Sequence, residues 1–299
     1  MRKTIITMLM ITLLSLALLA DTSGEAGFQM LRINPSAAYS AQAGTGAFFS
    51  VDGFAFVSNP AINALHRTRV ASMTQNYWLF DTVNNNFAYR YSTGKYGFGL
   101  GYNYLDYGKI TRRDEVGLPI GEFRPMDLRV ISNFAYRINP YNYAGVNVYG
   151  LYEKIDSASS VGLAFDLGYV FVTPIRDLYL GAALKHIGFT SKVHDENIKL
   201  PVCFDLSLGK QFSWQQTVLS TEAKLTKYSD DDNVKAAVGS TLTLMDMLFI
   251  RLGYKLNYDL EDLSLGFGVL YGKFNFDYAY LPISEDFDDV HKLGLTYRF

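Results

Sequence analysis

The stretch Tyr96–Tyr104 (YGFGLGYNY) decides the fold class of this chain. Its aromatic and apolar residues alternate strictly with Gly97, Gly99, Gly101 and Asn103. Side chains two positions apart lie on the same face of a β-strand, so the stretch predicts a strand with one apolar face and one glycine-rich face. Its Gly-x-Gly-x-Gly pattern superficially resembles a dinucleotide-binding loop, but strict alternation favours the strand.

The same period of two recurs from about residue 68 to the end of the chain. Runs at 163–171, 248–256 and 263–271 alternate as cleanly as the first. We predict fourteen strands, at 68–78, 84–93, 96–105, 126–137, 142–153, 160–172, 177–187, 201–211, 215–226, 233–244, 247–257, 263–272, 274–281 and 289–299.

Short and long connections alternate between these strands. Short turns are expected at 92–95, 139–141, 173–176, 211–213, 245–246 and 272–273. Longer connections are expected at 79–83, 106–125, 154–159, 188–200, 227–232, 258–262 and 282–288. An even number of roughly ten-residue strands, with short turns at one end and long loops at the other, is typical of outer-membrane β-barrels. We therefore predict an all-β fold, a 14-stranded antiparallel transmembrane barrel over residues 68–299.

The main alternative is a soluble β-sandwich or a lipocalin-like barrel, whose strands also alternate. Such a protein buries its apolar faces and presents polar faces to water. Here the non-apolar faces carry mostly glycine and small residues, which suits a crowded lumen better than a solvated surface. Fourteen apolar faces also exceed what one sandwich core would use, whereas a bilayer can solvate all of them.

Composition agrees with this class and excludes several others. Of 299 residues, 49% are apolar and 19% charged, with 22 Tyr, 21 Phe and 25 Gly. The 27 basic and 29 acidic residues nearly balance, which argues against a nucleic-acid partner. The one cysteine, Cys203, excludes an internal disulfide and a cysteine-based zinc site.

The N-terminus is predicted to be a signal peptide over residues 1–20. Arg2 and Lys3 precede an uncharged apolar run that ends near Ala20. An uncleaved membrane anchor is the alternative. Further along the chain no window approaches the length of a spanning helix. We expect signal-dependent export to the bacterial outer membrane, with membrane lipid and the barrel-assembly machinery as partners.

The last strand ends on an aromatic residue. His291, Leu293, Leu295, Tyr297 and Phe299 share one face, opposite Lys292 and other polar or small residues. This resembles the terminal strand of bacterial outer-membrane proteins, whose final aromatic residue helps to recruit the insertion machinery. The resemblance assigns Tyr297 and Phe299 to that assembly signal.

Residues 21–67 show no strand periodicity and are rich in small residues. A short helix is expected within 36–44, and a second one after Asn59, with Asn59 as N-cap and Pro60 at its first position. His66 and Arg67 would lie in its last turn. The segment is too small for a core of its own, so we predict a plug inside the barrel, held by Asn59-Pro60 and by inward charges such as Arg129 and Arg251.

Several motifs resemble those of the PorV/PorQ family. In residues 21–67 they comprise the run 28–33, Ala37-Ala38, Ala43-Gly44, Asp52 and Asn59-Pro60-Ala61. In the expected loop they comprise 105–110, with Tyr107 and Gly108, and then Asp114, Glu115, Gly117, Gly121, Glu122 and Phe123, followed by Asp127. The resemblance implies a FadL-type barrel with fourteen strands and an N-terminal plug. It also implies a link to type IX secretion, with secretion-system components or secreted cargo as partners.

No pattern of catalytic or metal-binding residues emerges, so we expect neither an enzyme nor a cofactor or metal. The four histidines form no closely spaced pair, and His186 and His194 are expected to be solvated at the end of a loop. Strand parity instead assigns nine charges to the lumen: Arg90, Arg129, Asp166, Lys185, Asp205, Arg251, Lys255, Asp277 and Arg298. These charges either form ion pairs that hold the plug and fill the barrel, or line a lumen that conducts solutes or binds a ligand.

Two functions fit this organisation. The first is a PorV/PorQ-type barrel that supports secretion or surface attachment through its outer loops. The second is a FadL-like transporter of hydrophobic small molecules. The loops at 106–125 and 188–200 are largely polar, which favours docking. The outer loops also carry acidic clusters at 230–232, 259–262 and 285–289, which keep the surface soluble, hold calcium or dock a partner.

Overall fold

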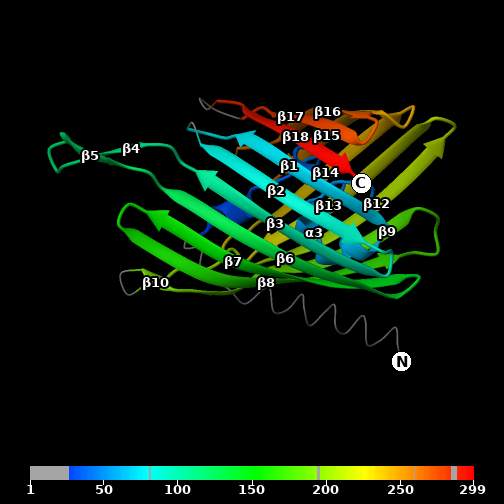
Figure 1. The fold of residues 1–299 in the computed structure, drawn as a ribbon, viewed down its shortest axis with the longest axis horizontal. Coiled ribbons are helices and arrows are strands. Elements are labelled where there is room, and N and C mark those ends of the chain that lie inside the picture. The colour runs from blue at the N-terminus through cyan, green and yellow to red at the C-terminus, as the bar shows by residue number, and fades with distance from the viewer. Residues whose placement is uncertain (1–26, 81, 194–195, 259, 284–287) are drawn as a thin grey trace.

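The chain forms a closed barrel of fourteen antiparallel strands in the computed structural model, which describes residues 27–80, 82–193, 196–258, 260–283 and 288–299 (Figure 1). The first barrel strand pairs with the last, from Val70 opposite Arg298 to Tyr77 opposite His291. This pairing leaves the sheet without an edge, which is the condition for a sheet to cross a bilayer. The signal-peptide prediction for 1–20 lies outside the described residues.

The strand pattern predicted from the sequence is confirmed. The barrel strands are β1 (Thr68–Tyr77), β2 (Val83–Ser92), β3 (Tyr96–Asp106), β6 (Met126–Asn139), β7 (Asn142–Ile155), β8 (Ala158–Val172), β9 (Leu178–Thr190), β12 (Cys203–Trp214), β13 (Thr217–Tyr228), β14 (Val234–Leu244), β15 (Leu248–Leu256), β16 (Leu263–Tyr271), β17 (Phe274–Leu281) and β18 (Val290–Arg298). Each pairs with its neighbours in sequence around the barrel.

The apolar faces of these strands point outward. Leu100, Leu252 and Phe267 are each more than half exposed, at 58%, 53% and 53%. Their alternating neighbours, such as Gly99 and Arg251, face the lumen, where Arg251 is buried. So large an exposed apolar surface is unusual on a soluble protein and fits a band solvated by lipid.

The alternation of short and long connections holds with one exception. The connection at 154–159 was expected to be long, but β7 and β8 continue to pair up to Ile155 opposite Ala158 and are joined by Asp156-Ser157. Asp156 adopts the left-handed φ of 54° that such a tight turn requires. Two pairs near the turn are polar, Glu153 with Ser160 and Lys154 with Ser159. The ladder between β7 and β8 therefore continues past the point where the apolar alternation in the sequence ends.

Two of the long loops contain short hairpins that periodicity did not reveal. The first consists of β4 (Ile110–Arg113) and β5 (Pro119–Phe123) and projects well beyond the barrel (Figure 1). The second consists of β10 (Lys192–Val193) and β11 (Glu196–Asn197). All the long loops lie at the end of the barrel that is normally extracellular, which we call the outer end; the short turns mark the periplasmic end.

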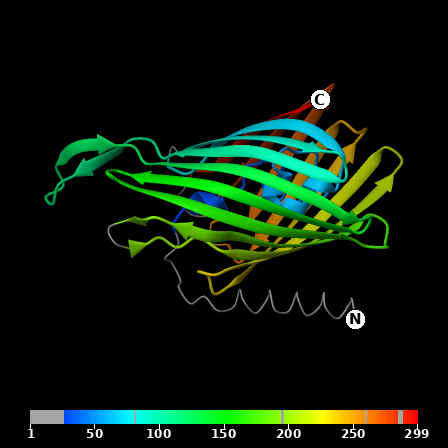
Figure 2. The same ribbon diagram turned by 60° about the horizontal axis from the view of Figure 1, so that its bottom comes forward.

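Residues 27–67, the N-terminal segment, lie inside the barrel (Figure 2). They form four short elements: η1 (Gln29–Arg32), α2 (Ala37–Ser40), α3 (Ala55–Ser58) and η2 (Pro60–Ala64). Asn59 caps η2 and Pro60 opens it, as predicted, but this helix is a 3-10 helix and ends at Ala64. His66 therefore lies beyond the last turn, where its Nε2 is 2.9 Å from the carbonyl oxygen of Phe48.

The main buried apolar cluster joins this segment to one half of the barrel wall. Phe48, Phe54, Phe56 and Ile62 are all at least 98% buried, and they pack against inward side chains of β2 and β6–β9. The segment thus provides the core that an empty barrel would lack. Among the described residues, no helix is long and apolar enough to cross a membrane.

We predict that Leu252→Arg, at the centre of β15, lowers the free energy of unfolding by about 2–4 kcal/mol, because it places a charge in the lipid near the midplane. Met247→Arg, at the turn that precedes the same strand, is the matched control and should lower it by only about 0–1 kcal/mol. A folding titration in lipid vesicles measures both. Equal effects of the two substitutions would contradict the facing of β15.

Candidate functional site

The lumen is the candidate site, and glycines allow the N-terminal segment to approach its wall closely. A Cβ built on Gly145 would lie 2.5 Å from the carbonyl carbon of Pro60, and one on Gly97 would lie 2.5 Å from the carbonyl oxygen of Asn63. A side chain at either position would therefore displace the segment. The glycine-rich faces seen in the sequence are therefore the surfaces against which the main chain of the segment packs.

Asn59 ties the segment to two strands. Its side-chain oxygen accepts the N–H of Ala61 at 3.0 Å, which caps η2. Its amide nitrogen donates to the carbonyl oxygens of Tyr169 on β8 and Ala182 on β9, at 3.2 and 3.0 Å. The carbonyl oxygen of Pro60 accepts a further bond from Asn133 at 3.2 Å.

Arg90 is one of the inward charges that hold the segment by direct hydrogen bonds. It is 1% exposed and donates to the Asn63 side chain at 2.9 Å and to the Ile62 carbonyl at 3.0 Å. Arg129 and Arg251, which the sequence also predicts in this role, have hydrogen-bond and ion-pair partners on the wall, while Arg251 also lies beside Asp52 of the segment. Asn103 on β3 accepts a hydrogen bond from Arg129 at 2.6 Å. Asp277 on β17 pairs with Arg251 on β15 at 2.7 Å.

Asp166 stabilises a break in the wall. The ladder between β8 and β9 shifts register at Asp166, and His186 adopts a left-handed φ of 62°. Asp166 accepts the freed N–H of His186 at 2.8 Å, and its other oxygen accepts from Tyr149 and Asn147. His186 is buried and bonds the Pro201 carbonyl, so the expectation of a solvated loop histidine is wrong; His194 lies outside the described residues.

A loop of the segment, residues 42–46, divides the lumen into two cavities. Gly44 and Gly46 adopt left-handed φ values of 78° and 93°. The Ala43 N–H donates to Ser264 at 2.9 Å, and Lys224 donates to the Gly44 carbonyl at 2.8 Å. We call residues 42–46 the partition, because Ala43 and Gly44 line the outer cavity while Gln42 and Gly46 line the inner one.

The inner cavity, near the periplasmic end, has a volume of about 270 Å³. Asp52 of the segment faces it beside the Arg251–Asp277 pair, and Arg298 lies at its rim. Asp52 accepts hydrogen bonds from Ser36 Oγ and the Phe54 N–H, both at 2.7 Å. The bond from Ser36 joins two parts of the segment that are 16 residues apart in the sequence.

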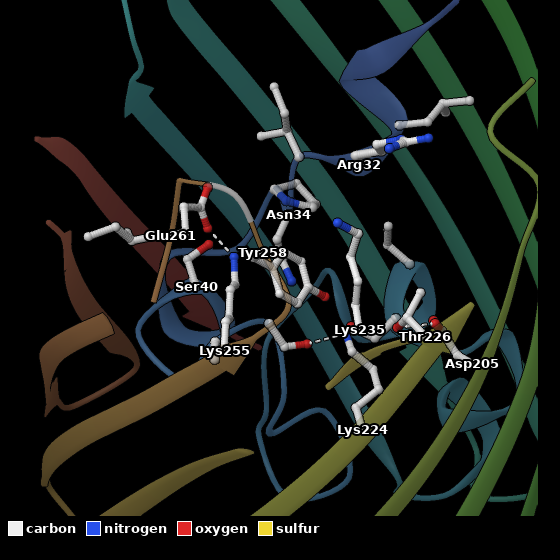
Figure 3. A pocket seen from close by; sticks show the side chains of 18 of the residues that line it. Arg32, Asn34, Ser40, Asp205, Lys224, Thr226, Lys235, Lys255, Tyr258 and Glu261 are labelled. Carbon is white, nitrogen blue, oxygen red and sulfur yellow. Dashed lines mark hydrogen bonds and ion pairs between the residues drawn. The ribbon is translucent and has the colours of Figure 1, made fainter. Parts of the chain in front are cut away.

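The outer cavity, of about 290 Å³, is lined by cations from several strands (Figure 3). Lys185 pairs with Asp205 at 3.4 Å, and Thr226 also donates to Asp205. Lys255 pairs with Glu261. Burial alone would raise the pKa of the Glu261 carboxyl, but the adjacent Lys255 ammonium outweighs it and holds that pKa below its ordinary value.

Parts of the acidic loops turn inward to this cavity. Asp230 pairs with Arg32 at 2.5 Å, and Asp231 pairs with Lys235 at 2.8 Å. They therefore neutralise cations of the lumen wall and of the N-terminal segment. Within the described ranges, no group of three or more His, Cys, Asp or Glu side chains could hold a metal ion.

All nine lumen charges expected from parity lie on the inner face, although Arg298 is only partly buried. The same reasoning missed three inward charges that line the outer cavity, Lys224, Lys235 and Lys292, and also the buried Glu222. A signal for Lys292 was present, because it alternates with the apolar face of the last strand. β13 offered a weaker signal, since Thr221 and Lys227 interrupt its outward face.

The loop residues that carry the family resemblance lie on or beside the projecting hairpin, away from the lumen. Tyr107, before β4, donates to Asp127 at 2.8 Å, and Glu122 pairs with Lys109 at 3.1 Å. The remaining motif residues shape the hairpin, with left-handed glycines and an acidic turn: Gly108, Asp114, Glu115, Gly117, Gly121 and Phe123.

The C-terminal aromatic residues form a cluster at the periplasmic end. The rings of Tyr297 and Phe299 meet edge to face at 4.8 Å. The Arg69 guanidinium lies 4.7 Å from the centre of the Phe299 ring, and the Phe299 N–H donates to the Arg69 carbonyl at 3.1 Å. The assembly role of this pair stays a prediction.

No protein-family model and no curated protein matches the chain. Solved structures do match. The toluene transporter TodX of Pseudomonas putida is 13% identical over 93% of this chain and 98% of its own, with a TM-score of 0.63. The toluene transporter TbuX of Ralstonia pickettii is 18% identical over 89% and 98%, with a TM-score of 0.59. A Pseudomonas aeruginosa FadL homologue is 14% identical over 88% and 98%, with a TM-score of 0.58.

At these identities the likeness establishes the fold alone. The chain has the fold of FadL-like outer-membrane barrels, which confirms the predicted fold class. The finer assignment to the PorV/PorQ family receives no support from family models or curated proteins.

The buried carboxyl of Asp52 is expected to make the packing of the N-terminal segment in the lumen depend on pH. Burial raises the pKa of its carboxyl from 3.8 to about 6, despite the two hydrogen bonds that favour the charged form. The folded protein therefore binds the proton more tightly than the unfolded chain. The stabilisation that Asp52 gives the folded protein is fully present below about pH 3.8 and is lost as the pH rises through about 6.

We predict that amides near 52–57 exchange more slowly at pH 5 than at pH 7.5, after correction for intrinsic rates. Asp52→Asn should remove this difference, whereas Asp246→Asn, an exposed acid at the periplasmic end, should preserve it. Hydrogen exchange followed by mass spectrometry measures both. A pH dependence that survives in Asp52→Asn would show that another group causes it.

Proposed function

We propose that this protein is a FadL-like outer-membrane transporter that passes small molecules through its lumen, with the partition as its closed gate. The observation that carries this proposal is the pair of cavities on opposite sides of one loop. One cavity lies towards each end of the barrel, so moving residues 42–46 would join them into a path. The transporters of the same fold named above support a non-enzymatic function of this kind.

The partition lies outside the two buried apolar clusters that contain other parts of the segment. Residues near Asn59 and Arg90 are fixed by hydrogen bonds and by the apolar cluster around Phe56. The partition itself is held mainly by polar bonds, such as those from Lys224 and Ser264. Local opening is easiest where few apolar contacts must be broken, so this loop is the natural element to move.

The cargo named for those neighbours is toluene or a monoaromatic hydrocarbon. The outer cavity of this chain instead combines apolar side chains such as Ile33 and Leu281 with several lysines. A small molecule that is part apolar and part anionic suits this lining better than a hydrocarbon does.

We predict that Gly253→Leu raises ion conductance in planar bilayers. A side chain at Gly253 would strike the Ala43 nitrogen and the Gln42 carbonyl carbon, and so push the partition from the wall. Gly150→Leu is the matched control, because nothing lies within 4 Å of a Cβ built at that outward position. Heat-modifiable gel mobility confirms that both variants fold. A folded Gly253→Leu barrel that conducts no better than Gly150→Leu would refute gating by the partition.

A second candidate function is PorV/PorQ-type support of secretion or surface attachment, and the projecting hairpin is the feature that favours it. Val116, Leu118 and Ile120 are 80%, 61% and 58% exposed near its tip. Apolar side chains on a hairpin that stands away from the barrel suit contact with another protein.

If this second function holds, replacing Val116, Leu118 and Ile120 by serine should reduce the amount of exported protein on the cell surface, because the docking contact is lost. The amount of folded barrel should not change. Lys109→Ser, on the same hairpin, serves as the control. Surface proteomics of cells carrying each variant provides the measurement, and an unchanged surface proteome would count against a docking role.

A further inference from the structure

The outer cavity holds more cations than carboxylates. Six basic side chains line it, and four carboxylates either line it or pair with those side chains from beside it, which leaves two basic groups without an ion-pair partner among the described residues. The cations are Arg32, Lys185, Lys224, Lys235, Lys255 and Lys292; the carboxylates are Asp205, Asp230, Asp231 and Glu261.

Lys224 and Lys292 account for the excess. Lys224 donates to the Gly44 carbonyl at 2.8 Å and Lys292 to the Asn34 carbonyl at 3.0 Å. No carboxylate of the described residues forms an ion pair with either ammonium group. Lys292 is 1% exposed, so little water competes with a ligand for its amine. Each ammonium has three N–H donors, which leaves donors available for an anionic ligand.

The remaining lining suits a small organic body. The Lys292 ammonium lies 4.7 Å from the centre of the Trp78 ring, and the Tyr258 ring lies 5.0 Å from Lys235 and 4.9 Å from Lys255. Leu281 adds an apolar surface beside Trp78. A volume of about 290 Å³ is at the lower end of the usual range for ligand pockets.

We infer that the outer cavity is a binding site for a small organic dianion, such as a phosphate monoester or a dicarboxylate with a short apolar body. Its charged groups would contact Lys224 and Lys292, and its apolar part would lie near Trp78. A dianion offers a negatively charged partner to each of the two lysines, whereas a monoanion can compensate only one of them. This inference rests on the proposed function, in which the outer cavity is the first site that an incoming solute meets.

The test is a charge series of similar ring compounds, titrated into the purified full-length barrel in detergent by calorimetry. Benzyl alcohol is neutral, benzoate is a monoanion, and phenyl phosphate is a dianion at pH 8. Ionic strength is held constant because salt screens these interactions. We expect phenyl phosphate to bind at least tenfold more tightly than benzoate, and benzyl alcohol to bind most weakly. Equal affinities across the series would overturn the inference.

Lysine variants locate the site. Lys224→Gln and Lys292→Gln should each weaken phenyl phosphate binding at least tenfold, because each removes a charge-assisted contact. Lys210→Gln is the matched control, since the Lys210 ammonium also donates to a main-chain carbonyl, that of Arg176, but at the periplasmic end. Heat-modifiable mobility verifies folding. Equal binding by all three folded variants would overturn the inference.

A second readout needs no change in the lysines. The chain has two tryptophans, Trp78 in the cavity and Trp214 at a periplasmic turn. In the Trp214→Phe protein, the emission of Trp78 should change as phenyl phosphate is added. It should reach half of its full change at a free ligand concentration equal to the Kd from calorimetry. An unchanged emission would place the ligand elsewhere and overturn the inference.

The two proposals fail separately. Absence of dianion binding, together with raised conductance of Gly253→Leu, would overturn the anion site and leave the gated transporter intact. Dianion binding with no change in conductance would retain the site and overturn the gate.

Discussion

The structure depends on one constraint: every main-chain N–H and C=O in the bilayer needs a partner within the protein. β1 meets this constraint by pairing with β18, so the sheet has no edge. Once the sheet is closed, strand alternation assigns every second side chain to lipid and every other one to the lumen. Hydrocarbon then tolerates the apolar faces, and the interior must compensate whatever polar and charged groups remain.

The interior solves that problem with the chain's own N-terminal segment. Glycines let its main chain reach the wall, and polar side chains such as Asn59 and Arg90 satisfy its carbonyl and amide groups. Phe48 and Phe56 give one half of the barrel an apolar core. The other half retains charge and space, which is why both cavities lie there. The lumen is therefore asymmetric, tightly packed on one side and holding two cavities lined by charged side chains on the other.

Charge compensation in the outer cavity links the loops to the lumen wall and to the N-terminal segment. Asp230, Asp231 and Glu261 come from loops that look like solvent-exposed acidic clusters, yet each neutralises a cation on the lumen wall or the N-terminal segment. Lys224 and Lys292 are instead bound to main-chain carbonyls of that segment. Lys224 thus both lacks an ion-pair partner and holds the partition, so in the functions proposed above ligand recognition and closure of the lumen share this side chain.

The sequence by itself determined the fourteen strands, their facing and the end of the barrel at which most loops are long, because period two and turn spacing are local properties. It also placed Arg90, Asp166 and Arg251 in the lumen by parity alone. Which of these groups meet was decided only by the tertiary structure. Lys224 and Lys292 are 68 residues apart, and only the closed register brings them to one cavity. The bulge at His186 likewise depends on how β8 and β9 pair, which no single strand specifies.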